Sequence, residues 1–320
     1  MIKRLYLDSR DWINLARISN GKEKDPVLIN VYEKIRKLSN ASKVIVPFSM
    51  FHLEDVMKNS NQKQREELID FIISISNGYV MKPFREYFKK EIENAIFNHL
   101  GANPIHDVKS QIIGQGIAYL AGQEYFITSP DSKIQKFLDE KNDELRNLAN
   151  SIETMKKLLK QEDFSSFIKN GRKEYVKLAS ILENKRQLRL KLDKTLRYKE
   201  GIVDYFFNIV IPQMAEILLN NKIKKDAISF KTKEDIELFL ERMPSINSFY
   251  RLSFARDEES PERKIQPNDL LDISHLAGAV PYCDIVVMEK MFASLCRKVK
   301  IDKKYGCIVL DQLRDLDEIL

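Results

Sequence analysis

Strand-like apolar runs lie near the two ends of this 320-residue chain, and the long stretch between them has the pattern of helices. In the first third, Val, Ile, Tyr and Leu runs predict strands at 3–7, 43–47 and 79–82, separated by helices around 11–18, 26–38, 49–57 and 62–75. Strands that alternate with helices of this length favour a parallel sheet with right-handed crossovers. Two more strand-like runs, 283–288 and 306–310, flank a helix at 290–299.

Residues 83–263 carry helical periodicity with glycine-rich interruptions. Two long charged segments, 132–161 and 165–200, could form an antiparallel hairpin. A strongly apolar helix at 202–220 should be kinked or interrupted at Pro212, because proline removes a helical hydrogen bond. The two C-terminal strands are too few to stand alone as a domain. We therefore expect one α/β domain, formed by residues 1–82 and 264–320 around a parallel sheet flanked by helices, with residues 83–263 as a large all-helical insertion.

The composition places limits on the class of protein. No apolar run reaches the ~20 residues that cross a bilayer, and the start, MIKRLYLDSR, lacks the apolar stretch of a signal peptide. The three cysteines show no metal-binding spacing and leave an odd thiol, which suits a reducing interior. We expect a cytoplasmic protein that does not enter a membrane.

Acidic residues stand at or beside the ends of the predicted strands. They are Asp8 after the first run, Glu54 on the helix after the second, Asp272 on a late helix, and Asp284 and Glu289 on either side of a late strand. Sites in open α/β sheets form outside the carboxyl ends of the strands. Carboxylates that converge there, without cysteine or histidine pairs, are hard-oxygen ligands for Mg²⁺ or Mn²⁺. This pattern points to metal-dependent phosphodiester chemistry.

Each acidic residue also has an ordinary structural explanation. Asp8 could cap the helix that follows it, and Glu54 could be a surface carboxylate. His275 lies on the same helical face as Asp272 and could position a phosphate or a water, or be a hydrogen-bonded structural histidine. Asp11 and Asn268 are candidates for supporting contacts around the ligands. The functional interpretation depends on the joint placement of these residues.

In this order, the motifs YLDSRDW, PFSMFHLEDV and NDLLDISHLAGA, followed by PYCDIVVMEK, resemble the PIN-like nuclease superfamily. The resemblance covers residues 1–82 and 264–320 and implies a PIN-like fold. It implies that Asp8, Glu54 and Asp272 bind the metal, with Asp284 or Glu289 as the fourth acidic position. Glu289 departs from the aspartate that the family usually has at that strand end. The implied activity is that of a hydrolase, an Mg²⁺- or Mn²⁺-dependent endoribonuclease in which a bound metal activates water for attack on phosphorus.

Basic charge is concentrated between residues 156 and 200, where 14 Lys and Arg face 6 Asp and Glu, a net of +8. Such a stripe attracts polyanions through counterion release, so it could guide RNA to the acidic site. Lys185, Arg186, Arg189 and Arg197 are its central members. A solvated helical face is the alternative interpretation.

The sequence contains no motif typical of a serine hydrolase or a P-loop nucleotide hydrolase, because it has no Gly-x-Ser-x-Gly elbow and no Walker-type loop. Two alternatives to an endoribonuclease remain. One is a catalytically inactive module that binds nucleic acid or protein, with the helical insertion holding a protein partner or a second copy of the chain. The other is a structure-specific DNA nuclease on the same scaffold.

Overall fold

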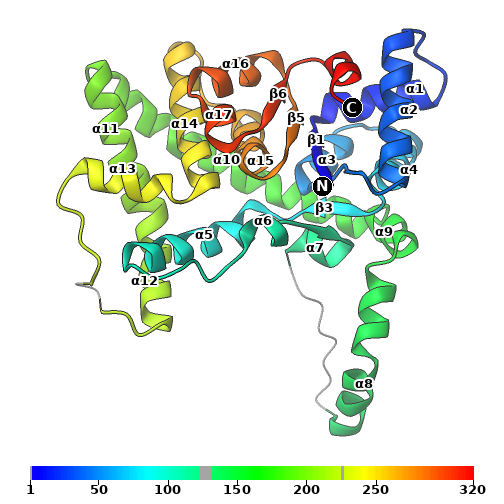
Figure 1. The fold of residues 1–320 in the computed structure, drawn as a ribbon, viewed down its shortest axis with the longest axis horizontal. Helices are drawn as coiled ribbons and strands as arrows, with labels where there is room; N and C mark the ends of the chain where they lie inside the picture. Colours follow the sequence, from blue (N-terminus) through cyan, green and yellow to red (C-terminus); the bar gives the residue numbers. More distant parts are fainter. Residues whose placement is uncertain (1, 123–130, 225–226) are drawn as a thin grey trace.

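A computed structural model describes residues 2–122, 131–224 and 227–320 of the chain, and four parallel strands from its two ends form the central sheet (Figure 1). The strand order is β2-β1-β5-β6. β1 pairs with β5 in the register Leu5 to Ile285 and Leu7 to Val287. The prediction that the first and last elements share one sheet is therefore confirmed. The strands are β1 (Lys3–Leu7), β2 (Val44–Ile45), β5 (Ile285–Val287) and β6 (Ile308–Leu310).

A second, antiparallel pair extends this arrangement and corrects one expectation. β3 (Tyr79–Met81) pairs with β4 (Ile113–Gln115). β4 lies within residues 83–263, the segment expected to be wholly helical. Phe48, just beyond β2, bridges to Val80 of β3 in parallel. The glycines in and next to β4 hide its strand pattern in the sequence. Glycine is required at position 114 because a Cβ there would lie 2.5 Å from the Tyr119 ring.

Helices of the N-terminal third pack on one face of the sheet. Side chains alternate along a strand, so Leu5 and Leu7 join the core beneath these helices, while Tyr6 joins the core on the opposite face. Asp25 caps the second helix and Pro26 opens it, as the sequence predicts. The helices are α1 (Ser9–Ser19), α2 (Pro26–Asn40), α3 (Met50–Met57) and α4 (Gln62–Ser76).

C-terminal helices cover the other face of the sheet, the side of Tyr6 and Val286. The nearest of them, α15, packs along α14 and β5. Its Gly278 allows close packing, because a Cβ there would lie 2.1 Å from the Tyr87 hydroxyl. The elements are α14 (Pro244–Glu259), α15 (Pro267–Tyr282), α16 (Lys290–Lys298) and α17 (Ile301–Tyr305). The 3₁₀ helix η3 (Leu313–Glu318) packs against α2 instead and joins the core on the other face.

The segment between β3 and α14 is helical apart from β4 and builds a third core of its own. Pro212 interrupts the apolar helix as predicted, because the turn before it is a π-helix, η1 (Phe206–Val210). The elements are α5 (Phe84–His99), α6 (Val108–Gln111), α7 (Ile117–Ala121), α8 (Ser132–Ala149), α9 (Ile152–Leu159), α10 (Glu162–Leu190), α11 (Lys194–Tyr205), η1, α12 (Ile211–Asn220) and α13 (Lys233–Glu241).

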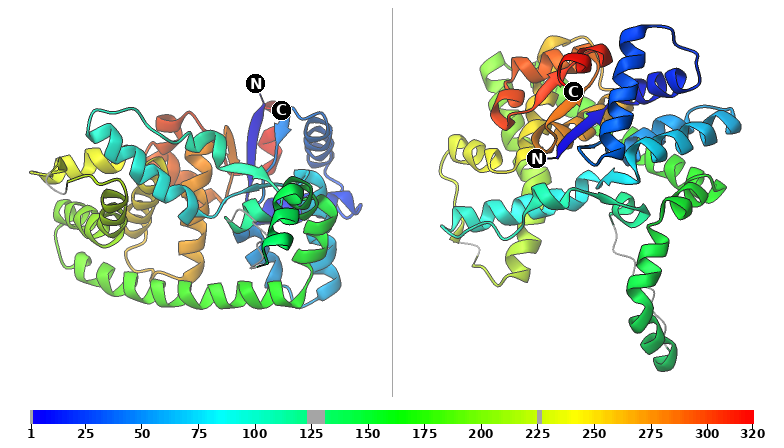
Figure 2. Two further views of the ribbon diagram at one scale, coloured as in Figure 1. Left: turned by 90° about the horizontal axis from the view of Figure 1, so that it is seen from below. Right: turned by 45° about the vertical axis from the view of Figure 1, so that its right-hand side comes forward.

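The predicted hairpin of two long helices is not formed. α8 projects away from the rest of the molecule, whereas α10 runs as one helix from Glu162 to Leu190 (Figure 1). In the view from below, α10 is the long green helix that spans the molecule (Figure 2). It packs against α15 and α3. A helix of the insertion thus lies against both halves of the α/β domain.

Within the described residues, one continuous helical run, Lys194–Asn220, is long and apolar enough to cross a membrane by length and composition. Only 33% of the most apolar stretch of this run is buried inside the protein. The buried side includes Ile202, Phe206 and Met214, which belong to the third core. Phe207 and Leu219 are exposed on the same run.

Candidate functional site: a cleft lined by carboxylates

Two acidic residues stand at the carboxyl ends of adjacent strands. Asp8 directly follows β1, and its N–H donates to the carbonyl oxygen of Val287, the last residue of β5, over 3.0 Å. Glu289 follows two residues later and precedes α16. Because β1 has β2 on one side and β5 on the other, the strand order reverses at this edge. Such a topological switch point is where open α/β sheets form sites.

A cleft of about 370 Å³ opens at this edge of the sheet. α1, α3 and α15 supply its walls, and four of its side chains are carboxylates. The lining residues are Asp8, Ser9, Arg10, Ile13, Asn14, Phe51, Asp55, Lys58, Asn268, Leu271, Asp272, His275 and Glu289.

The carboxylates of the cleft act on one another electrostatically. Partial burial raises the pKa of Glu289 above its ordinary range, and the nearby charges of Asp8 and Asp272 raise it further. Repulsion among these carboxylates favours either a proton or a cation in the cleft. Of the five acidic residues singled out in the sequence, Asp8, Asp272 and Glu289 line this cleft.

The donor chemistry of this cleft fits a divalent cation, since carboxylate oxygens are the ligands that Mg²⁺ and Mn²⁺ prefer. The carboxylates of the cleft are farther apart than the ligands of a formed metal site. Among the described residues, no group of three or more His, Cys, Asp or Glu side chains is close enough to hold a metal ion. Binding would therefore require the carboxylates around the cleft to rotate toward a common point.

Glu54 does not line the cleft, and its neighbour Asp55 does. Glu54 is buried, its Oε2 has no hydrogen-bond partner in the described structure, and burial raises its pKa to about 7. Adjacent positions on a helix point about 100° apart. The spacing of Phe51, Asp55 and Lys58, four and then three residues apart, places these three on the cleft side and could have identified Asp55 from the sequence.

Asp284 does not join the cluster, so this part of the prediction is wrong. It precedes β5, and its Oδ2 accepts from the backbone N–H of Arg4 at the start of β1, over 2.8 Å. Asp8 lies four residues farther along β1, about 13 Å at 3.3 Å per residue. Asp284 therefore lies at the amino edge of the sheet, where it supports the pairing of two strands.

One histidine lies behind the cleft and a second lines it. His52 is fully buried: the N–H of Ser49 donates to its Nδ1 over 2.9 Å, so its Nε2 carries the hydrogen donated to the carbonyl oxygen of Leu7 over 2.8 Å. Burial lowers the pKa of His52 to about 4, so it is neutral near pH 7. It ties α3 to the strand end that carries Asp8. Sequence reasoning missed this role, which no local pattern marks.

His275 lies beside Asp272, with Nε2 3.7 Å from its Oδ1. Its ring is 5.5 Å from that of Phe51, and its buried Nδ1 has no hydrogen-bond partner among the described residues. The predicted proximity to Asp272 is confirmed. Its role in holding a phosphate or a water stays a prediction.

The two expected supporting residues also lie at the cleft. Asp11 is buried and pairs with Arg10, which lines the cleft. Burial raises the pKa of Asp11 to about 6, although Arg10 opposes the shift. Asn268 lines the rim directly. Asp11 therefore acts on the cleft through Arg10, whereas Asn268 contacts it directly.

The central members of the basic stripe are occupied by ion pairs. Arg186 is buried and binds Glu183 and the carbonyl oxygen of Pro261. All four have acidic partners: Lys185 with Asp204, Arg186 with Glu183, Arg189 with Asp204 and Asp257, and Arg197 with Glu258. The structure gives these four a role in joining helices.

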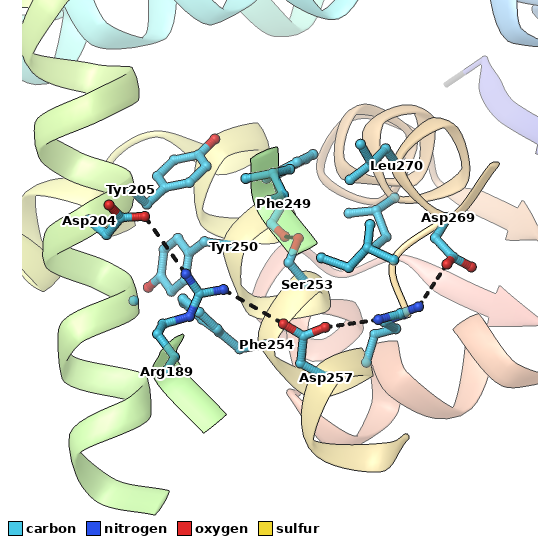
Figure 3. A pocket seen from close by; sticks show the side chains of 15 residues that line it. Arg189, Asp204, Tyr205, Phe249, Tyr250, Ser253, Phe254, Asp257, Asp269 and Leu270 are labelled. Carbon is cyan, nitrogen blue, oxygen red and sulfur yellow. Dashed lines mark hydrogen bonds and ion pairs between the residues drawn. The ribbon is translucent and has the colours of Figure 1, made fainter. Parts of the chain in front are cut away.

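A second cavity, of about 60 Å³, lies where α10 and α11 meet α14 and α15. Figure 3 shows Arg189 reaching from Asp204 to Asp257 beside this cavity. Arg256 continues the chain of ion pairs, from Asp257 at 3.0 Å to Asp269 at 2.7 Å. Asp269 lies in the first turn of α15, one turn before Asp272. Buried ion pairs thus tie the insertion to the helix that carries a cleft carboxylate.

Comparison with protein-family models, curated proteins and solved structures finds no match to this chain.

Proposed function

We propose that this protein is a metal-dependent nuclease of PIN-like fold that hydrolyses phosphodiester bonds in RNA. The observation that carries the proposal is the cleft at the switch point of the parallel sheet, where Asp8, Asp55, Asp272 and Glu289 converge around about 370 Å³. The motif resemblance supports the preference for RNA over DNA.

Asp8, Asp272 and Glu289 would hold the cation, and Asp55 would support them from α3. A bound Mg²⁺ or Mn²⁺ would neutralise phosphate charge and supply an activated water. Neutral His52 fixes the strand end beside Asp8, and His275 buttresses Asp272. Arg10 and Lys58 add positive charge to a cleft that would otherwise repel a phosphate backbone.

A binding module without catalysis is the second candidate, and one observation favours it. The described residues hold no preformed group of three metal ligands. In that case the cleft and the helical insertion would bind nucleic acid or a protein partner without cleaving it.

A cleavage assay on fluorescent RNA and DNA, each with Mn²⁺, with Mg²⁺ and with EDTA, separates these functions. We expect RNA cleavage that requires the metal. Faster cleavage of DNA would favour the DNA nuclease, and binding of RNA without cleavage in any metal would favour the inactive module.

A further inference from the structure

The long helix α10 holds the segment that leads into α15. The Arg186 guanidinium donates to the carbonyl oxygen of Pro261 over 2.8 Å, and the Glu183 carboxylate accepts from the N–H of Ile265 over 2.8 Å. Nearer the cleft, Arg172 donates to Oδ1 of Asn268 over 3.4 Å. Arg172 is therefore the member of this row that reaches a cleft-lining residue.

Two cations converge on that single amide oxygen. Lys58, from α3, donates to the same Oδ1 of Asn268 over 3.5 Å. Both hydrogen bonds are near the upper limit of length and are weak. A neutral acceptor leaves the positive charge of the Arg172 guanidinium uncompensated, so this place at the rim favours an anion.

The acidic residues nearby do not remove this charge. Lys58 pairs with Asp55, but Arg172 has no carboxylate within 4.0 Å among the described residues. Glu54 is electrostatically close to Arg172, but its side chain is buried and makes no ion pair with Arg172 among the described residues. The contact between Arg172 and Asn268 is exposed, so an anion can reach the guanidinium from solvent.

We propose that Arg172, Lys58 and the amide of Asn268 form a subsite for a backbone phosphate of the nucleic acid, so that the helical insertion supplies a substrate-binding residue to the cleft. The guanidinium of Arg172 offers a planar pair of donors that matches two phosphate oxygens, and Lys58 adds a point charge. This inference rests on the function proposed above, because the ligand is the substrate's own backbone.

The test is binding of a fluorescein-labelled twelve-nucleotide oligouridylate, measured by anisotropy across a salt series in EDTA. All proteins carry Asp272→Asn, which prevents turnover. Arg172→Gln should weaken binding about fivefold at 0.1 M salt and lower the slope of log affinity against log salt by about 0.7, the value for one lost contact to a single strand. Arg172→Lys should recover the slope, since it retains the charge.

Arg36→Gln is the matched control, because Arg36 lies on the exposed side of α2 and pairs with Glu33. It should leave the salt slope unchanged, and equal melting temperatures would show that every variant is folded. If Arg172→Gln binds with the parental slope, the subsite is wrong while the proposed function stands. If the Asp272→Asn parent does not bind oligouridylate at all, the proposed function and the subsite both fail.

Discussion

The N–H of Asp8 donates to the carbonyl oxygen of Val287 over 3.0 Å, so the ends of β1 and β5 are joined side by side although nearly the whole chain separates them. This contact puts Asp8 within the electrostatic reach of Glu289. The carboxylate cleft is thus a product of sheet topology, and its charge can be tested without knowing the substrate.

Divalent cations should stabilise the protein through this cleft. We expect Mn²⁺ to raise the wild-type melting temperature, because a ligand that binds only the folded state stabilises it by mass action. In EDTA, Asp8→Asn should melt at the wild-type temperature or slightly above it, because it removes a repelling charge while asparagine still caps α1. Mn²⁺ should raise the melting temperature of Asp8→Asn by less than it raises that of the wild type. Differential scanning fluorimetry checks this, and an equal rise in Asp8→Asn would exclude that residue as a ligand.

Glu91 should make folding stability depend on pH. This residue of α5 is fully buried, accepts from the N–H and hydroxyl of Ser245 and from the Tyr282 hydroxyl, and has its pKa raised to about 7 by burial. The folded state therefore binds the proton more tightly than the unfolded state. This contribution to stability is complete below about pH 4.5 and is lost as the pH rises through 7.

Glu91→Gln mimics the protonated side chain and should abolish this dependence. Between pH 4.5 and 8, the wild type should lose on the order of 3 kcal/mol relative to the variant. Urea unfolding at both pH values measures it, and other titrating groups cancel in the difference. A constant difference across the range would show that Glu91 has an ordinary pKa in the folded protein.

Arg186 should be a structural residue of the basic stripe. Replacing it by methionine removes its bonds to Glu183 and to the Pro261 carbonyl oxygen, and should cost roughly 2 kcal/mol because both acceptors lose a charged donor. The control Lys191→Gln, at an exposed position at the end of α10, should change stability by less than about 0.5 kcal/mol. Chemical denaturation compares the two, and equal stability of both variants would refute a bracing role.

Most of the sheet could be predicted from the sequence, because strands and helix caps have recognisable local residue patterns. Asp25 and Pro26 mark the start of α2, and apolar runs mark β1 and β5. The site was predicted in part: Asp8, Asp272 and Glu289 follow from strand ends and helix faces. Asp284 failed because it precedes β5, and in a parallel sheet a residue before a strand lies at the amino edge, opposite the edge that carries Asp8. β4, the course of α10 and the contact of Arg172 with Asn268 depend on tertiary packing, which no local pattern encodes.

The most direct test of the central claim compares carboxylates at opposite edges of the sheet. Cleavage of one oligoribonucleotide with Mn²⁺ is measured for the wild type, Asp8→Asn, Asp272→Asn and Asp284→Asn, as kcat/KM. We predict that the first two variants lose more than the roughly 10–100-fold typical of residues that merely support metal ligands. Asp284→Asn, whose amide oxygen can still accept from the Arg4 N–H, should stay within about twofold of the wild type. Wild-type turnover by Asp8→Asn and Asp272→Asn, or an equal loss in Asp284→Asn, would contradict a catalytic cleft at the carboxyl ends of β1 and β5.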